Sequence, residues 1–238
     1  MTLRRLLPIL LLALGVGCQF ERLQQARVAQ AVKGLEQAMA AGQPLPALPT
    51  DRSPFGAYWP ILEHMHTQGG RLREASQQVE ALGKADGEAL RPERLADPEH
   101  RRKEHDRLGA LVRHLETALD AEDELVGPKG QAFVQALPIG ADFKRGLLNG
   151  YQSKNGTLEL LVGIMRQKRD YYRRMEGIIT LSDQGLEGRD AEGKLRFRTH
   201  EQVMAYYGEV TELLKAERKL NEDVARFQSH RPTGASAS

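Results

Sequence analysis

The sequence predicts an all-α protein, an antiparallel bundle of four or five long helices with one short β-hairpin near residues 186–198. Two observations lead to this fold class, and a third limits the chemistry that the fold can hold. Apolar residues recur every three or four positions over several long segments. Glycine and proline separate these segments. The chain has a single cysteine, which excludes an intramolecular disulfide and a cysteine-based zinc site.

The first helix is expected to begin almost directly after Cys18, so no long flexible tether separates the two. Its apolar residues recur at near-helical spacing, and glycine and proline within residues 42–46 end it. A proline-rich connector over residues 43–54 leads to a second helix at about residues 56–82. The Gly69-Gly70 pair is a weak point within that helix.

The third helix is expected to begin at Pro98, because Asp97 is a good N-cap and proline is favoured at the first helical position. The Gly127-Pro128 pair ends it. Residues 83–97 are polar and are expected to be irregular. Two shorter helical pieces follow the third helix, over residues 131–137 and 142–148.

A long helix is expected over about residues 157–181, followed by a break at residues 182–198. Within this break Asp190 to Gly193 form a turn signal, and residues 194–198 alternate polar and apolar, which predicts a hairpin or flap. Thr199 and Gln202 form a capping box that opens the last helix. The apolar seam of that helix predicts packing against neighbouring helices. Its residues are Val203, Tyr206, Val210, Leu213, Leu220, Val224 and Phe227.

The N-terminal residues have the three zones of an export signal. Arg4 and Arg5 form a positive region, and residues 6–14 form an apolar run that is too short to span a bilayer. Gly15-Val16-Gly17 then leads to Cys18. This pattern resembles the lipobox of bacterial lipoproteins, with glycine at position 15 where that family usually has leucine.

The lipobox resemblance implies that residues 1–17 are a signal peptide and that Cys18 carries acyl chains, which anchor the protein in the cell envelope facing the periplasm. Gln19 favours the outer membrane, because aspartate at this place favours the inner membrane in enterobacterial lipoproteins. One alternative stays open, an ordinary signal peptide in which Cys18 is incidental. The Arg4-Arg5 pair suggests twin-arginine export, but the residues around it fit that signal poorly. The expected domains are a signal peptide (1–17), a lipid-anchored helical bundle (18–228) and a disordered tail (229–238).

The order of features also resembles a functionally uncharacterised family of helical lipoproteins of the enterobacterial type. The similarity lies in a helix directly after Gly17-Cys18, in Leu45 to Leu48 before Phe55-Gly56, and in Gly193 to Phe197 before a Thr199-capped helix with Tyr206-Tyr207. This resemblance implies a helical, membrane-anchored protein. It transfers no catalytic residue.

The charge of the chain argues against a nucleic-acid partner. The 34 basic and 32 acidic residues give a net charge of +2, and residues 1–17 contain two arginines and no acidic residue. The remaining chain is therefore neutral and has no strong long-range attraction for phosphates.

The chain has several polar clusters, and none of them predicts a catalytic, cofactor or metal centre. His64 and His66 point about 200° apart on a helix and cannot share a metal ion. The acidic run at residues 120–124 lies near a helix C-terminus, where the macrodipole disfavours negative charge, and this could mark a cation or partner contact. The possible ligand or partner surface consists of Trp59, Arg169, Tyr171, Tyr172 and Arg173.

The sequence therefore predicts a non-enzymatic, membrane-anchored envelope lipoprotein that acts as an interaction or scaffold module for an unknown envelope protein. The alternative is a ligand-binding or sensory helical bundle in the periplasm, with a pocket between helices near Trp59, Tyr171 and Tyr172.

Overall fold

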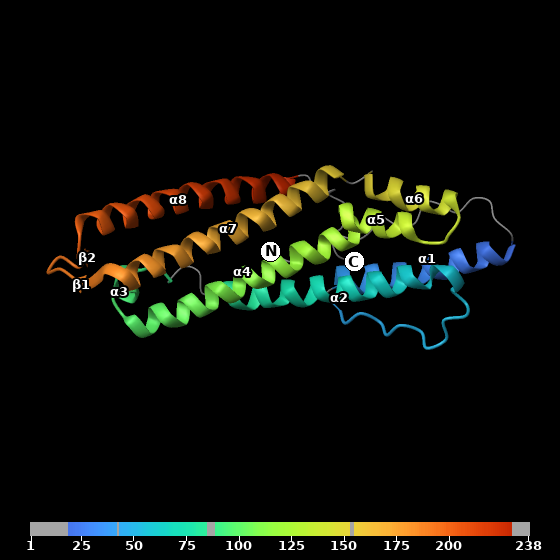
Figure 1. The fold of residues 1–238 in the computed structure, drawn as a ribbon, viewed down its shortest axis with the longest axis horizontal. Coiled ribbons are helices and arrows are strands. Elements are labelled where there is room, and N and C mark those ends of the chain that lie inside the picture. Colours follow the sequence, from blue (N-terminus) through green and yellow to red (C-terminus); the bar gives the residue numbers. More distant parts are fainter. Residues whose placement is uncertain (1–18, 42, 85–88, 153–154, 230–238) are drawn as a thin grey trace. The chain divides into compact units, whose positions relative to one another are not determined.

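The computed structural model describes residues 19–41, 43–84, 89–152 and 155–229. Residues 1–18, with the predicted signal peptide and Cys18, lie outside the described residues, as do residues 230–238 of the predicted tail. In chain order the elements are α1 (Gln19–Ala41), the 3₁₀ helix η1 (Gly56–Tyr58), α2 (Trp59–Leu82), α3 (Pro92–Leu95), α4 (Pro98–Val126), α5 (Pro128–Ala136), α6 (Ala141–Gln152), α7 (Asn155–Gly185), β1 (Leu186–Arg189), β2 (Leu195–Phe197) and α8 (His200–Ser229) (Figure 1).

The all-α class with one short hairpin is confirmed. Five helices of the described chain, α1, α2, α4, α7 and α8, are between 23 and 31 residues long. The predicted hairpin lies where the alternating sequence placed it, at Leu186–Phe197.

The chain divides into two compact units, whereas the sequence analysis treated residues 18–228 as one domain. Unit 1 contains the described residues of Met1–Gln77 and Thr117–Leu158, and unit 2 contains those of Gln78–Glu116 and Glu159–Ser238. Helices α2, α4 and α7 each contribute to both units. Each unit has its own buried residues.

In unit 1, α2 runs through the Gly69-Gly70 pair without a break. At this pair, α1 and the connector before α2 pack closely against the helix. A Cβ atom at Gly69 would lie 3.1 Å from the sulfur of Met39 on α1 and 3.8 Å from Leu45 of the connector. The missing side chain therefore makes room for α1 and the connector on this part of α2. The glycines expected to weaken the helix are a packing feature of its surface.

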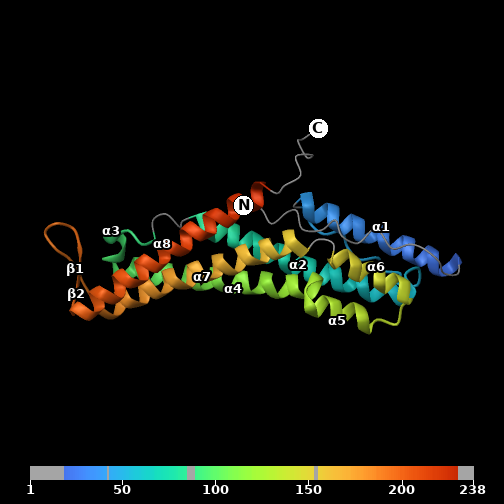
Figure 2. The same cartoon turned by 90° about the horizontal axis from the view of Figure 1, so that it is seen from above.

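In unit 2, α7 and α8 run side by side in opposite directions (Figure 1 and Figure 2). Arg174 on α7 pairs with Glu209 on α8, and Gln167, two turns earlier on α7, bonds Asp223, further along α8. These helices share one core with the unit 2 part of α4. Its largest fully buried side chains are Leu95, Leu108, Leu111, Leu115, Tyr172, Met175, Ile178 and Ile179.

The hairpin between α7 and α8 is an antiparallel pair of strands with a bulge between Leu186 and Gly188. Gly188 (φ 139°) and Gly193 (φ 84°) adopt backbone conformations that favour glycine. The Asp190 carboxylate accepts hydrogen bonds from the backbone N–H groups of Glu192 (2.9 Å) and Lys194 (2.8 Å). The turn signal read from the sequence is thus an Asx-type turn.

Two helix starts have the caps that the sequence predicts. The Asp97 carboxylate accepts from the Glu99 N–H at 2.9 Å at the start of α4. At the start of α8, the Gln202 N–H donates to the Thr199 hydroxyl and the Thr199 N–H donates to the Gln202 side chain, both at 3.2 Å. This reciprocal pair is a capping box.

One helix was missed: α3 lies within residues 83–97, which were expected to be irregular. Leu95 of α3 is fully buried, and its carbonyl accepts from Arg101 Nη1 at 2.6 Å. Arg101 is itself buried and its Nε donates to Asp183 on α7 at 2.5 Å. Tertiary contacts therefore stabilise a helix that is too short to form alone.

Candidate functional site

The first turns of α1, which follow Cys18 in the sequence, are fixed to unit 1 by a buried polar contact. The Tyr58 hydroxyl donates to Glu21 Oε1 at 2.7 Å and accepts from Gln25 Nε2 at 2.8 Å. Tyr58 is only 2% exposed, and its ring packs edge-on against Phe143 of α6 at 4.9 Å between centroids. Any group attached just before α1 is therefore connected to a firmly docked helix.

The Tyr58 hydroxyl stays protonated and keeps its role as donor to Glu21. Burial raises the pKa of the Tyr58 hydroxyl, and the Glu21 carboxylate raises it further, while the hydrogen bond from Gln25 acts in the opposite direction. The two side chains of α1 are one turn apart, so a single hydroxyl holds the N-terminal part of the helix.

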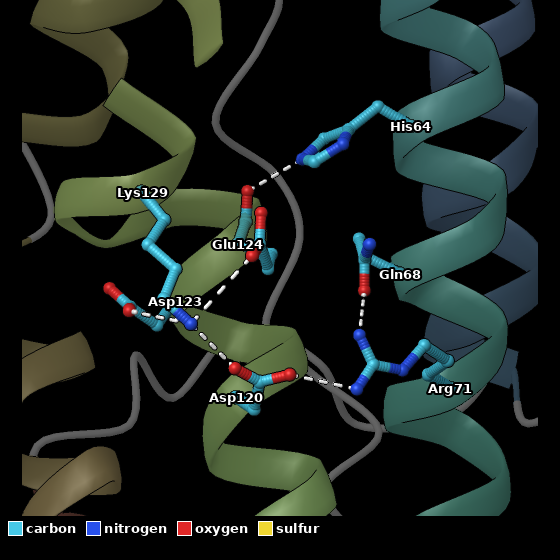
Figure 3. A network of polar contacts seen from close by, with 7 residues as sticks. All are labelled: His64, Gln68, Arg71, Asp120, Asp123, Glu124 and Lys129. Atoms are coloured by element: carbon cyan, nitrogen blue, oxygen red, sulfur yellow. Dashed lines mark hydrogen bonds and ion pairs between the residues drawn. The ribbon is translucent and has the colours of Figure 1, made fainter. Parts of the chain in front are cut away.

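The acidic run at the end of α4 surrounds a lysine from the next helix (Figure 3). Lys129 Nζ lies 2.6 Å from Asp120 Oδ1, 3.7 Å from Asp123 Oδ2 and 3.7 Å from Glu124 Oε1. The positive charge that lies among these carboxylates is thus the side chain of Lys129 from the same chain. Because α5 begins directly after α4, the ion pairs help to hold the turn between the two helices.

Arg71 of α2 extends the network from its other side (Figure 3). Its Nη2 donates to Asp120 Oδ2 at 2.8 Å and its Nη1 donates to Gln68 Oε1 at 2.7 Å. The hydrogen bonds from Lys129 and then Arg71 lower the pKa of Asp120, and the hydrogen bond to Asp120 raises the pKa of Lys129. Asp120 is therefore the centre of the network.

His64 contacts the end of α4 and does not act together with His66. Its Nε2 lies 2.7 Å from the carbonyl oxygen of Glu124, and its ring stacks on Phe133 at 4.0 Å between centroids. A histidine at a helix C-terminus can satisfy one of the carbonyls that have no partner within the helix. Among the described residues, no group of three or more histidine, cysteine and acidic side chains could hold a metal ion.

The prediction that Tyr172 and Trp59 belong to an exposed ligand or partner surface is wrong, because both side chains are buried. Tyr172 has no exposed surface, because it belongs to the core of unit 2. Trp59 is 7% exposed in unit 1, where it packs against Phe55 and beneath the Arg52 guanidinium. Both aromatic residues are structural, since a partner cannot contact side chains that are almost completely covered.

The other three residues of that predicted surface lie on α7 in unit 2. Arg169 Nη2 pairs with Asp170 Oδ1 at 2.8 Å, and Arg173 forms an ion pair with Glu116 of α4. Tyr171 is half-buried and packs edge-on against Tyr172. Carboxylates therefore already engage both arginines, which reduces their attraction for an anionic ligand.

A different surface, on α8, was missed by the sequence analysis. In the described residues, three of the four large apolar side chains that are exposed lie on this helix: Met204 (60%), Tyr207 (55%) and Leu214 (59%). The signal was a second apolar series offset by one residue from the predicted seam. It was overlooked because the seam that includes Tyr206 and Leu213 accounted for the burial of the helix.

Comparisons with known proteins add no relative: no protein-family model, no curated protein and no solved structure matches the chain. In the part of the chain that the structure describes, no helix is both long enough and apolar enough to cross a membrane.

Proposed function

We propose that this protein is a lipoprotein of the bacterial cell envelope, anchored by acyl chains on Cys18, and that it acts without catalysis as an interaction module. The leader pattern of residues 1–17 supports the anchor. With that anchor, the docking of α1 through Tyr58 would keep unit 1 near the membrane surface, because α1 begins directly after Cys18 in the sequence.

The interaction role rests on one observation, the exposed apolar side chains of α8. Met204, Tyr207 and Leu214 form a row on a helix that already buries its opposite side. Single exposed apolar residues are ordinary on protein surfaces, but three on the same side of one helix favour a contact with another molecule. The polar clusters of the described chain, in contrast, consist of groups that neutralise each other.

The anchor is tested by replacing Cys18 with alanine in the full chain. Labelling with a radioactive or clickable fatty acid should disappear, and residues 1–17 should remain uncleaved. Residues 19–238 exported behind an unrelated cleavable signal should be recovered in the soluble periplasmic fraction, because stable membrane binding needs more than a neutral protein surface. Tight membrane binding of that form would contradict anchoring by Cys18.

The interaction role is tested separately with a photo-reactive amino acid at position 214 in the native host. Illumination should give a discrete cross-linked product. The same substitution at Leu23, which is 49% exposed in unit 1, is the matched control and should give none. Equal labelling at the two positions would refute a specific contact at α8.

A further inference from the structure

The exposed side chains of α8 have the spacing of a coiled-coil seam. Met204, Tyr207, Thr211 and Leu214 follow one another at intervals of three, four and three residues, which is the a/d pattern of a heptad. At about 100° per residue these four positions fall within an arc of about 80°. Tyr206 and Leu213, which are buried in unit 2, lie about 130° away from the middle of that arc.

Thr211 is compatible with an apolar contact although it carries a hydroxyl. The hydroxyl donates to the carbonyl of Tyr207 at 2.8 Å within the helix. Its hydrogen-bonding need is thus met without water or a partner, and the methyl group can pack. The four positions therefore form an uninterrupted seam, here called the outer seam of α8.

Two residues of opposite charge lie on one edge of the outer seam, near its two ends. Glu201 lies before its N-terminal end and Lys215 directly after its C-terminal end, and both are exposed. Gly208 lies between them on the same edge, and a Cβ atom there would meet nothing within 4 Å. When a second copy of the helix runs in the opposite direction, Glu201 of one copy can therefore meet Lys215 of the other.

We propose that the outer seam of α8 binds the same seam of a second copy of this chain, in an antiparallel helix pair. A two-fold axis near residue 209 places Met204 opposite Leu214 of the second copy, and Tyr207 opposite Thr211 of the second copy. Lys215 then faces Glu201 of the second copy on both sides of the axis. In a parallel pair, Glu201 and Lys215 would lie on opposite sides of the interface and could not meet, so this ion pair favours the antiparallel arrangement.

This inference rests on the proposed interaction role and names the partner. The outer seam covers only about three helical turns, so the pair is expected to be weak for molecules free in solution. Lipid anchoring would confine both copies to one membrane and raise their effective concentration. The ion pair of Lys215 with Glu212 (2.7 Å) is exposed, and an exposed pair of this kind is exchanged at little cost.

The test uses the full chain in the envelope of the host. A Gly208→Cys variant should form a disulfide-linked dimer under mild oxidation, because position 208 lies next to the axis. Gly34→Cys on α1, also a helical glycine with open space, is the matched control and should not do so. The chain with Cys18 alone controls for disulfides at the anchor.

Substitutions in the Gly208→Cys background identify the pairing. Met204→Glu should lower the dimer yield more than tenfold, since it places a charge in the seam, whereas Leu23→Glu should leave it unchanged. Glu201→Lys and Lys215→Glu should each lower the yield by on the order of two- to fivefold, and the double variant should restore it.

Failure of the double variant to restore the yield would overturn the antiparallel pairing. Absence of the dimer, together with a cross-link from position 214 to another envelope protein, would refute self-pairing and leave the interaction role intact. Absence of both products would contradict the interaction role as well.

Discussion

The Tyr58→Phe substitution tests whether a single buried hydroxyl holds the start of α1. It leaves the ring and its contact with Phe143 in place and removes only the oxygen that joins Glu21 to Gln25. Glu21 is half-buried and can regain water, but Gln25 is 8% exposed and would lose its partner inside the unit. The main cost is therefore the desolvated amide of Gln25.

The expected loss of stability is about 1–2 kcal/mol, the range for a buried polar group left without its partner. For a chain of this size each kcal/mol lowers Tm by roughly 2–4 °C. Urea denaturation of the full chain, monitored by the circular dichroism signal of its helices, gives the free energy of unfolding. Compared with the unmodified chain, the variant should show faster amide hydrogen exchange in the first turns of α1, and its exchange in α8 should change less.

Tyr207→Phe is the matched control, because its ring is 55% exposed and water can replace any hydrogen bond of its hydroxyl. This variant should change stability by less than about 0.5 kcal/mol. If Tyr58→Phe behaves like the control, or if α1 exchanges no faster, the hydroxyl does not hold α1.

Two further perturbations follow from the same structure. The pKa of Asp120 is lowered in the folded protein, so its ionised form contributes stability above the unfolded-state pKa, and this contribution is lost as the pH falls through the folded-state pKa. Asp120→Asn should therefore show a smaller decrease of Tm than the unmodified chain between about pH 5 and about pH 3, and an equal decrease would refute this role. Gly130→Ala should destabilise by about 1–3 kcal/mol, since its Cβ would lie 2.6 Å from the carbonyl oxygen of Glu124. Gly34→Ala, with nothing within 4 Å, should instead stabilise by about 0.5–1 kcal/mol, and thermal melting that ranks the two glycine variants in the reverse order would be inconsistent with the packing.

The lysine in the acidic run illustrates why the candidate site was only partly predictable. The unusual negative charge near the end of α4 was visible in the sequence, where it indicated either a solvated helix end or a contact with a cation or partner. Lys129 follows the run closely, but its proximity to all three carboxylates depends on the turn between α4 and α5. Arg71, 49 residues before Asp120, carries no local signal that it belongs to the same network.

The features that could be predicted from the sequence are local ones. Helix starts at Asp97 and at Thr199, and the turn at Asp190, depend on hydrogen bonds between residues at most four positions apart, so residue type and spacing were sufficient to predict them. The pattern before Cys18 is also local, and lipidation at Cys18 stays a prediction.

Which of several similar side chains are covered depends on the tertiary structure. Tyr171 and Tyr172 are neighbours in sequence, yet one is half-buried and the other has no exposed surface. On α8 a shorter second series lies one residue after the predicted seam, and unit 2 buries Tyr206 and Leu213 while Leu214 stays exposed. Periodicity reveals that a helix has an apolar face, but burial depends on which other helices pack against that face, and those contacts join residues far apart in the chain.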